Sequence, residues 1–458
     1  MLKLPFSTRI PAALLGLGLA ASAQAGLLSS VTKTVLSDLL DAEVANASGH
    51  VLALVHPSST NVLDAAVAAA ELTGLQINGV FEQVGVFGAT GTPALFSQLA
   101  ATGLIRRVEY NRPLRYFLNS SHQATGGRDV LNGSVGGVAY DGSGIGVAVV
   151  DSGIDGTHPD FQGRMGGNVK LIPLTALAID LEDTDGISAG GHGTHVAGTV
   201  AGTGAASGGD RHGAAPGATL YGVSGGTAIS MHSAVAGLEW VLDNHDQVSP
   251  AIRVVNNSWG SGAGPHDPGS ATALANQALV NAGIVVVFAA GNDGGDGSSQ
   301  QTSPTCVDPT PGVICVASYN DQNSGTVNGP MSSFSSRGRN GEPNTYPDIS
   351  APGDQIIAPC RLTLPICVTG TDGSNEYATL SGTSMAAPHI AGIVAQILQA
   401  NPALTPAQVE DILEDTARQI STGAAYQPDP ANPTTPTSFD KGHGLVDVGA
   451  AVAEALTR

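Results

Sequence analysis

Short apolar runs alternate with amphipathic stretches along most of the chain after residue 140. The runs are continuously apolar, which is typical of parallel strands that are buried on both faces. We predict such strands at residues 145–150, 220–223, 253–255, 284–288 and 313–317. Apolar positions three and four residues apart predict helices at residues 193–202, 230–242, 271–281, 384–400 and 406–416. The pattern therefore predicts an α/β fold, with a doubly wound, mostly parallel sheet between two helical layers.

Residues 26–118 form a shorter stretch in which predicted strands also alternate with predicted helices. We predict strands at residues 50–55, 79–87 and 105–110, with helices at 61–75 and 93–102. This stretch is expected to form a small α+β unit of its own. Residues 119–141 are rich in Ser, Gly and Asn, a composition that predicts an exposed and cleavable linker.

Residues 1–25 have the features of a secretory signal. Lys3 and Arg9 come early, residues 10–21 are apolar, and Ala23-Gln24-Ala25 offers a small-residue cleavage site. The apolar run is shorter than the ~20 residues that cross a bilayer, which disfavours a membrane anchor. We therefore expect a secreted protein, either extracellular or periplasmic, with no membrane partner.

Four cysteines lie in Gly- and Pro-rich loops of this exported chain: Cys306, Cys315, Cys360 and Cys367. The simplest of the three pairings gives two local disulfides, Cys306–Cys315 and Cys360–Cys367. A four-cysteine metal site is the alternative, and the absence of any CxxC spacing disfavours it.

The net charge of −20 is carried entirely by the part of the chain after residue 122, since residues 1–122 contain seven basic and seven acidic residues. An acidic surface disfavours nucleic acid and anionic membranes as partners. Solubility alone is the plainer explanation of the charge.

Three short motifs hold the residue types of a nucleophilic triad. Asp151 directly follows the first predicted strand of the larger part, His192 lies in Gly-His-Gly-Thr-His, and Ser384 lies in Gly-Thr-Ser-Met-Ala before an apolar helix. A serine hydroxyl needs a base within hydrogen-bond reach and a third group that orients the base. Ser384, His192 and Asp151 supply these three groups. Asn292, in Ala-Gly-Asn after another strand, could donate its amide to the developing oxyanion.

The order Asp, His, Ser, together with Asn292, resembles the subtilisin family (subtilases) of serine endopeptidases from about residue 120 to the C-terminus. The resemblance implies a subtilisin-like fold, an acyl-enzyme mechanism that needs no cofactor, and broad specificity for proteins and peptides. Residues 26–119 resemble, more loosely, the ferredoxin-like inhibitory propeptide of the family. The implied domains are a signal peptide (1–25), a propeptide (26–119) and a catalytic domain (120–458), which we expect to be monomeric.

The resemblance also implies substrate-binding positions. Ser258, Trp259 and Gly260 correspond to the strand that lines the S1 pocket, while Gly225 and Gly226 would pair with the substrate backbone. Residues 221–240 form a shorter stretch than in typical subtilisins, which leaves the subsites beyond S1 open. Counting back from the aspartate motif places the mature N-terminus near residue 120, and we expect the enzyme to cut this junction itself.

Other residues allow competing interpretations. Ser224 lies in Gly-Val-Ser-Gly-Gly, which matches the nucleophile elbow of α/β-hydrolases, with Asp447 and His443 as downstream partners by position only. His195 could suggest a metal pair with the triad histidine, but a packed helix histidine is the plainer interpretation. An acidic loop before that helix is either a calcium site or a solvated loop; its carboxylates are Asp180, Glu182, Asp183 and Asp185.

The residues of the chain disfavour two other functions. An inactive subtilase used as a binding module usually lacks a triad member or the oxyanion donor, and this chain has all four. The Ser-Glu-Asp acid peptidases of the same fold would need Glu at position 192 and Asp at position 292, where this chain has His and Asn. Asp293 either biases the S1 pocket toward basic side chains or simply faces solvent in a turn.

Overall fold

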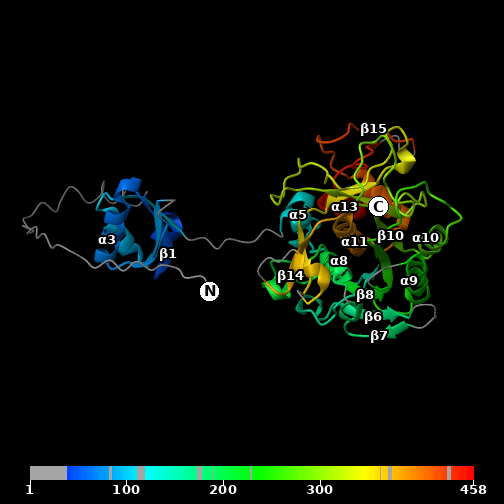
Figure 1. Cartoon of the computed structure of the whole chain (residues 1–458), viewed down its shortest axis with the longest axis horizontal. Helices are drawn as coiled ribbons and strands as arrows, with labels where there is room; N and C mark the ends of the chain where they lie inside the picture. Colours follow the sequence, from blue (N-terminus) through cyan, green and yellow to red (C-terminus); the bar gives the residue numbers. More distant parts are fainter. Residues whose placement is uncertain are drawn as a thin grey trace, which may run out of the picture. The chain divides into compact units, whose positions relative to one another are not determined.

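The computed structural model describes residues 39–81, 85–110, 119–172, 178–188, 190–226, 230–361, 363–369, 374–430 and 435–458. The chain divides into two compact units, Met1–Leu114 and Arg115–Arg458 (Figure 1). The predicted signal peptide lies outside the described residues. Among those that are described, no helix combines the length and the apolar character needed to cross a membrane.

The first unit is a four-stranded antiparallel sheet with two main helices. Its elements are α2 (Ala42–Ala45), β1 (Val51–Pro57), η1 (Thr60–Val62), α3 (Leu63–Thr73), β2 (Gln76–Phe81), β3 (Val86–Gly91), α4 (Pro93–Ala100) and β4 (Ile105–Tyr110). The strand order β2-β3-β1-β4 confirms the predicted ferredoxin-like arrangement. Phe87 and Phe96 are fully buried in its core. The single strand predicted at 79–87 is wrong: β2 and β3 form a hairpin, and Gly85 between them has a φ of 73°, which favours glycine.

The second unit is built on an eight-stranded sheet in the order β12-β11-β10-β9-β5-β8-β6-β7. Its strands are β5 (Gly146–Asp151), β6 (Met165–Leu171), β7 (Ala178–Asp180), β8 (Thr219–Ser224), β9 (Ile252–Asn257), β10 (Val285–Ala289), β11 (Val313–Tyr319) and β12 (Ile349–Pro352). All pairs are parallel except β6 with β7, which confirms the mostly parallel sheet. Short hairpins β13 (Ile356–Pro359) with β14 (Tyr377–Leu380), and β15 (Gln427–Pro428) with β16 (Pro436–Thr437), lie outside it.

Helices cover both faces of this sheet, as the apolar pattern predicts. On one face, α8 (His192–Ala201), α11 (Thr383–Ala400) and α13 (Val448–Ala455) share a core with the strands. On the other face, α9 (Met231–Asn244) and α10 (Ala271–Asn281) pack against a second core. Further helices of this unit are α7 (Asp185–Ser188), α12 (Pro406–Asp415) and the short η2 (Pro159–Phe161), η3 (Ala205–Ser207), η4 (Pro343–Thr345) and η5 (Pro365–Thr369). Nearly every residue of α11 is buried, so the helix that begins beside Ser384 is held on all sides.

The exposed linker predicted at residues 119–141 is wrong at its start. Two helices, α5 (Asn119–Thr125) and α6 (Gly127–Leu131), occupy this stretch, and Ser120, Ser121 and Thr125 are buried. His122 anchors α5, because its Nε2 lies 3.1 Å from the carbonyl oxygen of His212 and the two imidazole rings pack together. A polar segment can be buried when hydrogen bonds within the protein replace its contacts with water. This is the case for α5, which is why its polar composition did not predict its burial.

Both predicted disulfides, Cys306–Cys315 and Cys360–Cys367, are present. The sequence separations are 9 and 7 residues, so each bridge closes a short local loop. All four cysteines are fully buried.

Candidate active site

Asp151 and His192 meet at the edge of the sheet where the parallel strands end. Asp151 is the last residue of β5, and His192 is the first residue of α8. The Nδ1 atom of His192 lies 2.7 Å from Oδ1 of Asp151, which also accepts the backbone N–H of Ser152 at 2.7 Å. The Asp151 side chain is 5 % exposed, whereas that of His192 is 27 % exposed. The buried carboxylate can therefore orient an imidazole whose other face reaches solvent.

The surroundings of His192 change its pKa in opposing directions. Burial disfavours the charged ring, but the charge of Asp151, its hydrogen bond and the charge of Asp185 outweigh this effect, and the pKa of His192 is raised. A base must be neutral to accept a proton, so activity is expected to fall as the pH drops through a value above the ordinary ~6.5.

Ser384 lies in the first turn of α11, directly after β14 and a Ser-Gly-Thr turn. Its hydroxyl donates to the carbonyl oxygen of Ser258 at 3.0 Å, and the Ser258 hydroxyl donates back to the carbonyl oxygen of Ser384 at 2.9 Å. The hydroxyl thus faces Ser258 rather than His192 in this structure. Catalytic hydrogen bonds are often poorly aligned until substrate binds, so this geometry is compatible with a nucleophile.

Asn292 faces the same region from the loop after β10. Its Oδ1 accepts the backbone N–H of Thr383 at 2.9 Å and the Thr383 hydroxyl at 3.0 Å. Because the amide oxygen is held in this way, the Nδ2 group is the end that can donate to a substrate oxygen. Sequence reasoning missed the role of Thr383, although its place next to Ser384 was a usable signal.

A cavity of about 280 Å³ opens between these residues. Ser384 and Asn292 line it together with the predicted Trp259 and Gly260, and among the described residues that line it Asp293 is the one that carries a charge. Trp259 is held in place because its indole N–H donates to the carbonyl oxygen of Val150 at 2.9 Å and its ring packs edge-on against Phe288.

Gly225 and Gly226 follow β8, next to Asp151 in the sheet. The N–H of Gly225 donates to the carbonyl oxygen of Asp151 at 2.9 Å, and Gly226 has a φ of 98°. Neither glycine lines the 280 Å³ cavity. Their role in pairing with a substrate backbone remains a prediction.

Ser224 does not have the surroundings of a nucleophile. It is fully buried at the end of β8, donates its hydroxyl to the carbonyl oxygen of Ser152 at 2.5 Å and accepts from Lys170 Nζ at 3.2 Å. Its suggested partners are engaged elsewhere, since Asp447 pairs with Arg418. His443 lies beside two other carboxylates, Glu414 and Asp429. These contacts disfavour the hydrolase elbow.

His195 is a packed helix histidine. It is fully buried, and its Nε2 lies 3.1 Å from the carbonyl oxygens of both Ile356 and Ala378. Burial lowers the pKa of His195 to about 3, so the ring is neutral and can donate one hydrogen bond from Nε2. It ties α8 to the β13–β14 hairpin.

The acidic loop before α8 is largely occupied by hydrogen bonds. Asp185 is buried and accepts from the hydroxyls of Ser152 and Thr194, while Asp183 accepts the backbone N–H groups of residues 185 and 186. Asp180 accepts the N–H of Asn168. Calcium at these residues stays a prediction, and no described contact supports it.

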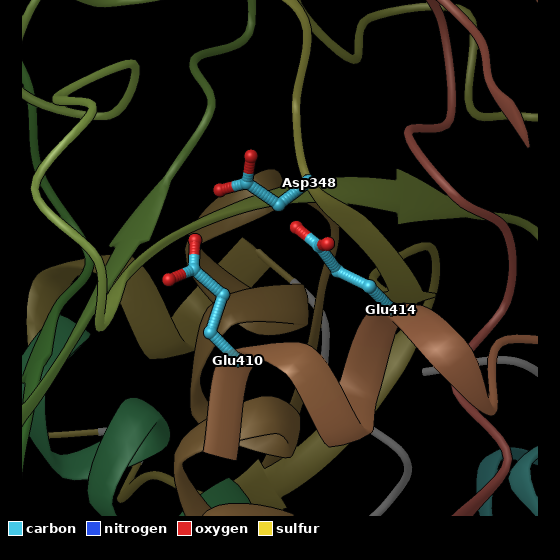
Figure 2. A group of neighbouring side chains, drawn as sticks. All are labelled: Asp348, Glu410 and Glu414. Carbon is cyan, nitrogen blue, oxygen red and sulfur yellow. The ribbon is translucent and has the colours of Figure 1, made fainter. Parts of the chain in front are cut away.

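A different carboxylate group comes together on the second unit. Asp348, directly before β12, and Glu410 and Glu414, on α12, have oxygen atoms within 4.8 Å of one another (Figure 2). These carboxylates could share protons or hold a cation. They line a separate acidic cavity of about 770 Å³, which does not include the triad.

We expect Glu410→Gln to stabilise the enzyme at pH 8 and to have little effect at pH 4. Burial and the charges of neighbouring carboxylates raise the pKa of both Asp348 and Glu410. The folded protein therefore holds these protons more tightly than the unfolded chain, and the free energy of unfolding falls as the pH rises above about 4. Removing one charge should raise Tm by about 2 °C or more in calorimetry at pH 8. Glu239→Gln, at an exposed glutamate of α9, is the control. Equal Tm changes in both variants would contradict the prediction.

The parallel sheet, the Asp151–His192 contact and a serine at the start of a buried helix together define an α/β serine hydrolase. Residues 142–446 match the Subtilase family (Peptidase S8), which is more than half of the chain. The chain belongs to the subtilase family of serine endopeptidases.

Relatives of known activity agree with this assignment. The chain is similar to Serine protease AprX of Bacillus subtilis, with 36% identity over 349 residues that span 73% of this chain and 74% of AprX. It is 35% identical to Subtilisin E of the same species over 317 residues, which span 68% of this chain and 66% of that protein. Among solved structures, the S41 psychrophilic protease has a TM-score of 0.54 at 26% identity, covering 70% of this chain and 97% of that one.

Proposed function

We propose that this chain is a secreted, self-processed zymogen whose mature form hydrolyses peptide bonds in proteins with broad specificity. Two observations carry the proposal: the 2.7 Å contact between Asp151 and His192, and a cavity that both Ser384 and Asn292 line. Extended substrates bound through their main chain are recognised by shape more than by sequence, which supports broad specificity.

In the proposed mechanism, Ser384 Oγ attacks the scissile carbonyl carbon while His192 Nε2 accepts its proton. Asp151 holds the proton of Nδ1, which leaves Nε2 as the acceptor, and its charge stabilises the imidazolium. The oxyanion accepts hydrogen bonds from Asn292 Nδ2 and from the backbone N–H of Ser384. The first amides of a helix have no partner within it, and the helix dipole favours negative charge there. His192 then protonates the leaving amine, and water hydrolyses the acyl-enzyme.

The test is casein hydrolysis by the processed protein, with and without a fluorophosphonate that reacts with activated serines. Labelling at Ser384 that abolishes hydrolysis would support the proposal. A folded and processed protein that neither labels nor hydrolyses would indicate the binding module instead.

We propose residues 26–119 as the inhibitory propeptide and residues 120–458 as the catalytic domain. The division of the chain after Leu114 and the ferredoxin-like topology of the first unit support this arrangement. A cut between residues 119 and 120 would lie within α5 and would have to open a helix with buried serines, so the structure moves our proposed junction to just before Asn119. N-terminal sequencing of the mature form locates the cut.

Secretion is supported by the apolar N-terminal run and by the two buried disulfides, which form in oxidising compartments. One relative is named Extracellular serine proteinase, from Thermus sp., at 34% identity. A monomer remains our proposal, and sedimentation of the mature enzyme tests it.

Within this broad specificity, the charge of Asp293 supports a bias toward basic P1 side chains. Asp293 is exposed and lies among small residues of the cavity wall, so a Lys or Arg side chain of a substrate could approach its carboxylate. Sequencing the peptides that the mature enzyme releases from a mixed proteome tests this preference. An apolar P1 profile would contradict it.

We expect Asn292→Ala to lower kcat by about 10²- to 10³-fold with little change in KM, a loss established for the oxyanion asparagine of subtilisin itself. The amide is needed only when charge develops on the substrate oxygen, so ground-state binding should persist. Steady-state kinetics on a chromogenic peptide measure both constants. Asn281→Ala, at the exposed end of α10, is the control and should match the wild type. A tenfold rise in KM at constant kcat would contradict the oxyanion role.

A further inference from the structure

The Cys360–Cys367 disulfide lies in the segment that connects β13 with β14, at the loop end of the hairpin. Cys360 directly follows β13, and its N–H donates to the carbonyl oxygen of Glu376, the residue before β14, at 2.8 Å. Both cysteines are fully buried in a small cluster with Leu364 and Ala378. The bridge therefore lies inside the protein, at a point where two chain segments meet.

The two sulfur atoms contact Gly191, the residue immediately before His192. A Cβ atom at Gly191 would lie only 2.7 Å from Cys367 Sγ and 2.8 Å from a methyl carbon of Ile366. Cys360 Sγ lies 3.4 Å from the carbonyl oxygen of Gly191. Gly191 caps α8 with a φ of 95°, a conformation that other residues rarely adopt. The disulfide thus packs directly against the N-terminus of α8.

The same hairpin connects the elements that carry the base and the nucleophile. On one side, His195 Nε2 lies 3.1 Å from carbonyl oxygens of both β13 and β14, and Pro359 packs against Gly198 of α8. On the other side, β14 ends at Leu380, four residues before Ser384. A change at the end of the hairpin can therefore reach both His192 and Ser384.

We propose that Cys360 and Cys367 are positioning residues: their disulfide holds Gly191 and His192 in place relative to Ser384, and catalysis depends on the bridge being oxidised. This inference rests on the proposed roles of His192 and Ser384. Bonded sulfurs are about 2.05 Å apart, whereas atoms that are not bonded to one another pack at about 3.5–4.0 Å. In a buried cluster, separated thiols must push on their neighbours, and Gly191 is in direct contact with them.

The Cys360–Cys367 bridge can be opened by chemical reduction. A trialkylphosphine gives two electrons to the S–S bond, water supplies the two protons and the oxygen, and the products are two thiols and the phosphine oxide. A displacement of about 1 Å at a catalytic group can cost about 100-fold in rate. Opening the bridge should therefore lower kcat far more than it raises KM.

The experiment compares two mature double variants, Cys360→Ala/Cys367→Ala and Cys306→Ala/Cys315→Ala. The second pair is the matched control, because it is equally buried and closes a loop of similar length. We expect the 360/367 variant to lose about 10- to 100-fold in kcat, with KM within about twofold of the wild type. The acid limb of its pH profile should move to lower pH, because a loosened contact with Asp151 no longer raises the pKa of His192. The control should lose thermal stability but keep its kcat and its acid limb.

Unchanged kcat in the folded 360/367 variant would overturn the inference, as would equal losses in both variants with an unmoved acid limb. Should the variant fail to fold, the wild-type mature enzyme is reduced with phosphine and alkylated, and mass spectrometry identifies the opened pair. Full activity with Cys360 and Cys367 alkylated would equally overturn it. An oxidised wild-type enzyme that a fluorophosphonate does not label would instead refute the proposed function, so the two failures are distinguishable.

Discussion

Replacing Ser384 with alanine should abolish peptide hydrolysis, with a fall in kcat of about 10⁶-fold, the loss known for subtilisin when its nucleophile is removed. The reason is chemical: without the hydroxyl there is no acyl-enzyme, and only binding and the oxyanion donors remain. If the enzyme cuts its own junction, Ser384→Ala should also accumulate as an uncut proform in a protease-deficient host. Chromogenic peptide kinetics and the intact mass of the product measure both effects.

Ser224→Ala is the matched control, because Ser224 is the rival nucleophile suggested by the sequence. Losing its buried hydrogen bonds should cost about 1 kcal/mol of stability while activity and processing persist. Substantial hydrolysis by Ser384→Ala would refute its role as the nucleophile. Complete processing of Ser384→Ala in the protease-deficient host would refute self-cleavage alone.

Local motifs made the site predictable from the sequence. Asp151, His192 and Asn292 each lie at the end of a strand or the start of a helix, where parallel strands bring their ends to one edge of the sheet. The five predicted strands of the second unit were found because each is a mostly apolar run, although the one at 253–255 begins with Arg253. In contrast, β6 contains Gly166, Gly167 and Asn168, so neither continuous nor alternating apolar character marks it.

Contacts between distant segments could not be predicted. Asp348, Glu410 and Glu414 meet only because α12 packs near the start of β12, and nothing in their local sequences predicts this. The contact between the Cys360–Cys367 bridge and Gly191 joins residues about 170 positions apart. The pairing of the cysteines was predictable, whereas their position next to the histidine helix depends on the fold.

Asp151→Asn should reduce kcat by about 10⁴-fold, the effect of this type of change in serine peptidase triads. Oδ1 of Asp151 accepts from both His192 Nδ1 and the N–H of Ser152, while Oδ2 is buried without a partner among the described residues. An asparagine must therefore either turn its NH₂ group toward these two donors or bury it unpaired at the Oδ2 position. In both orientations His192 loses the charge that stabilises its protonated form.

The same variant also tests whether Asp151 raises the pKa of His192. If it does, the acid limb of the pH profile of the residual activity should move to lower pH. Burial lowers the pKa of His192, and the charge and hydrogen bond of Asp151 are the main effects that raise it. Without them, His192 stays neutral, and able to accept a proton, at lower pH than in the wild type. Profiles of kcat/KM against pH measure the shift, and Asp246→Asn, at an exposed aspartate after α9, is the control that should leave the limb in place. An unmoved limb in Asp151→Asn would mean that another group orients the base. Asp185 is the candidate, because its charge also raises the pKa of His192 and it is hydrogen-bonded to Ser152 and Thr194.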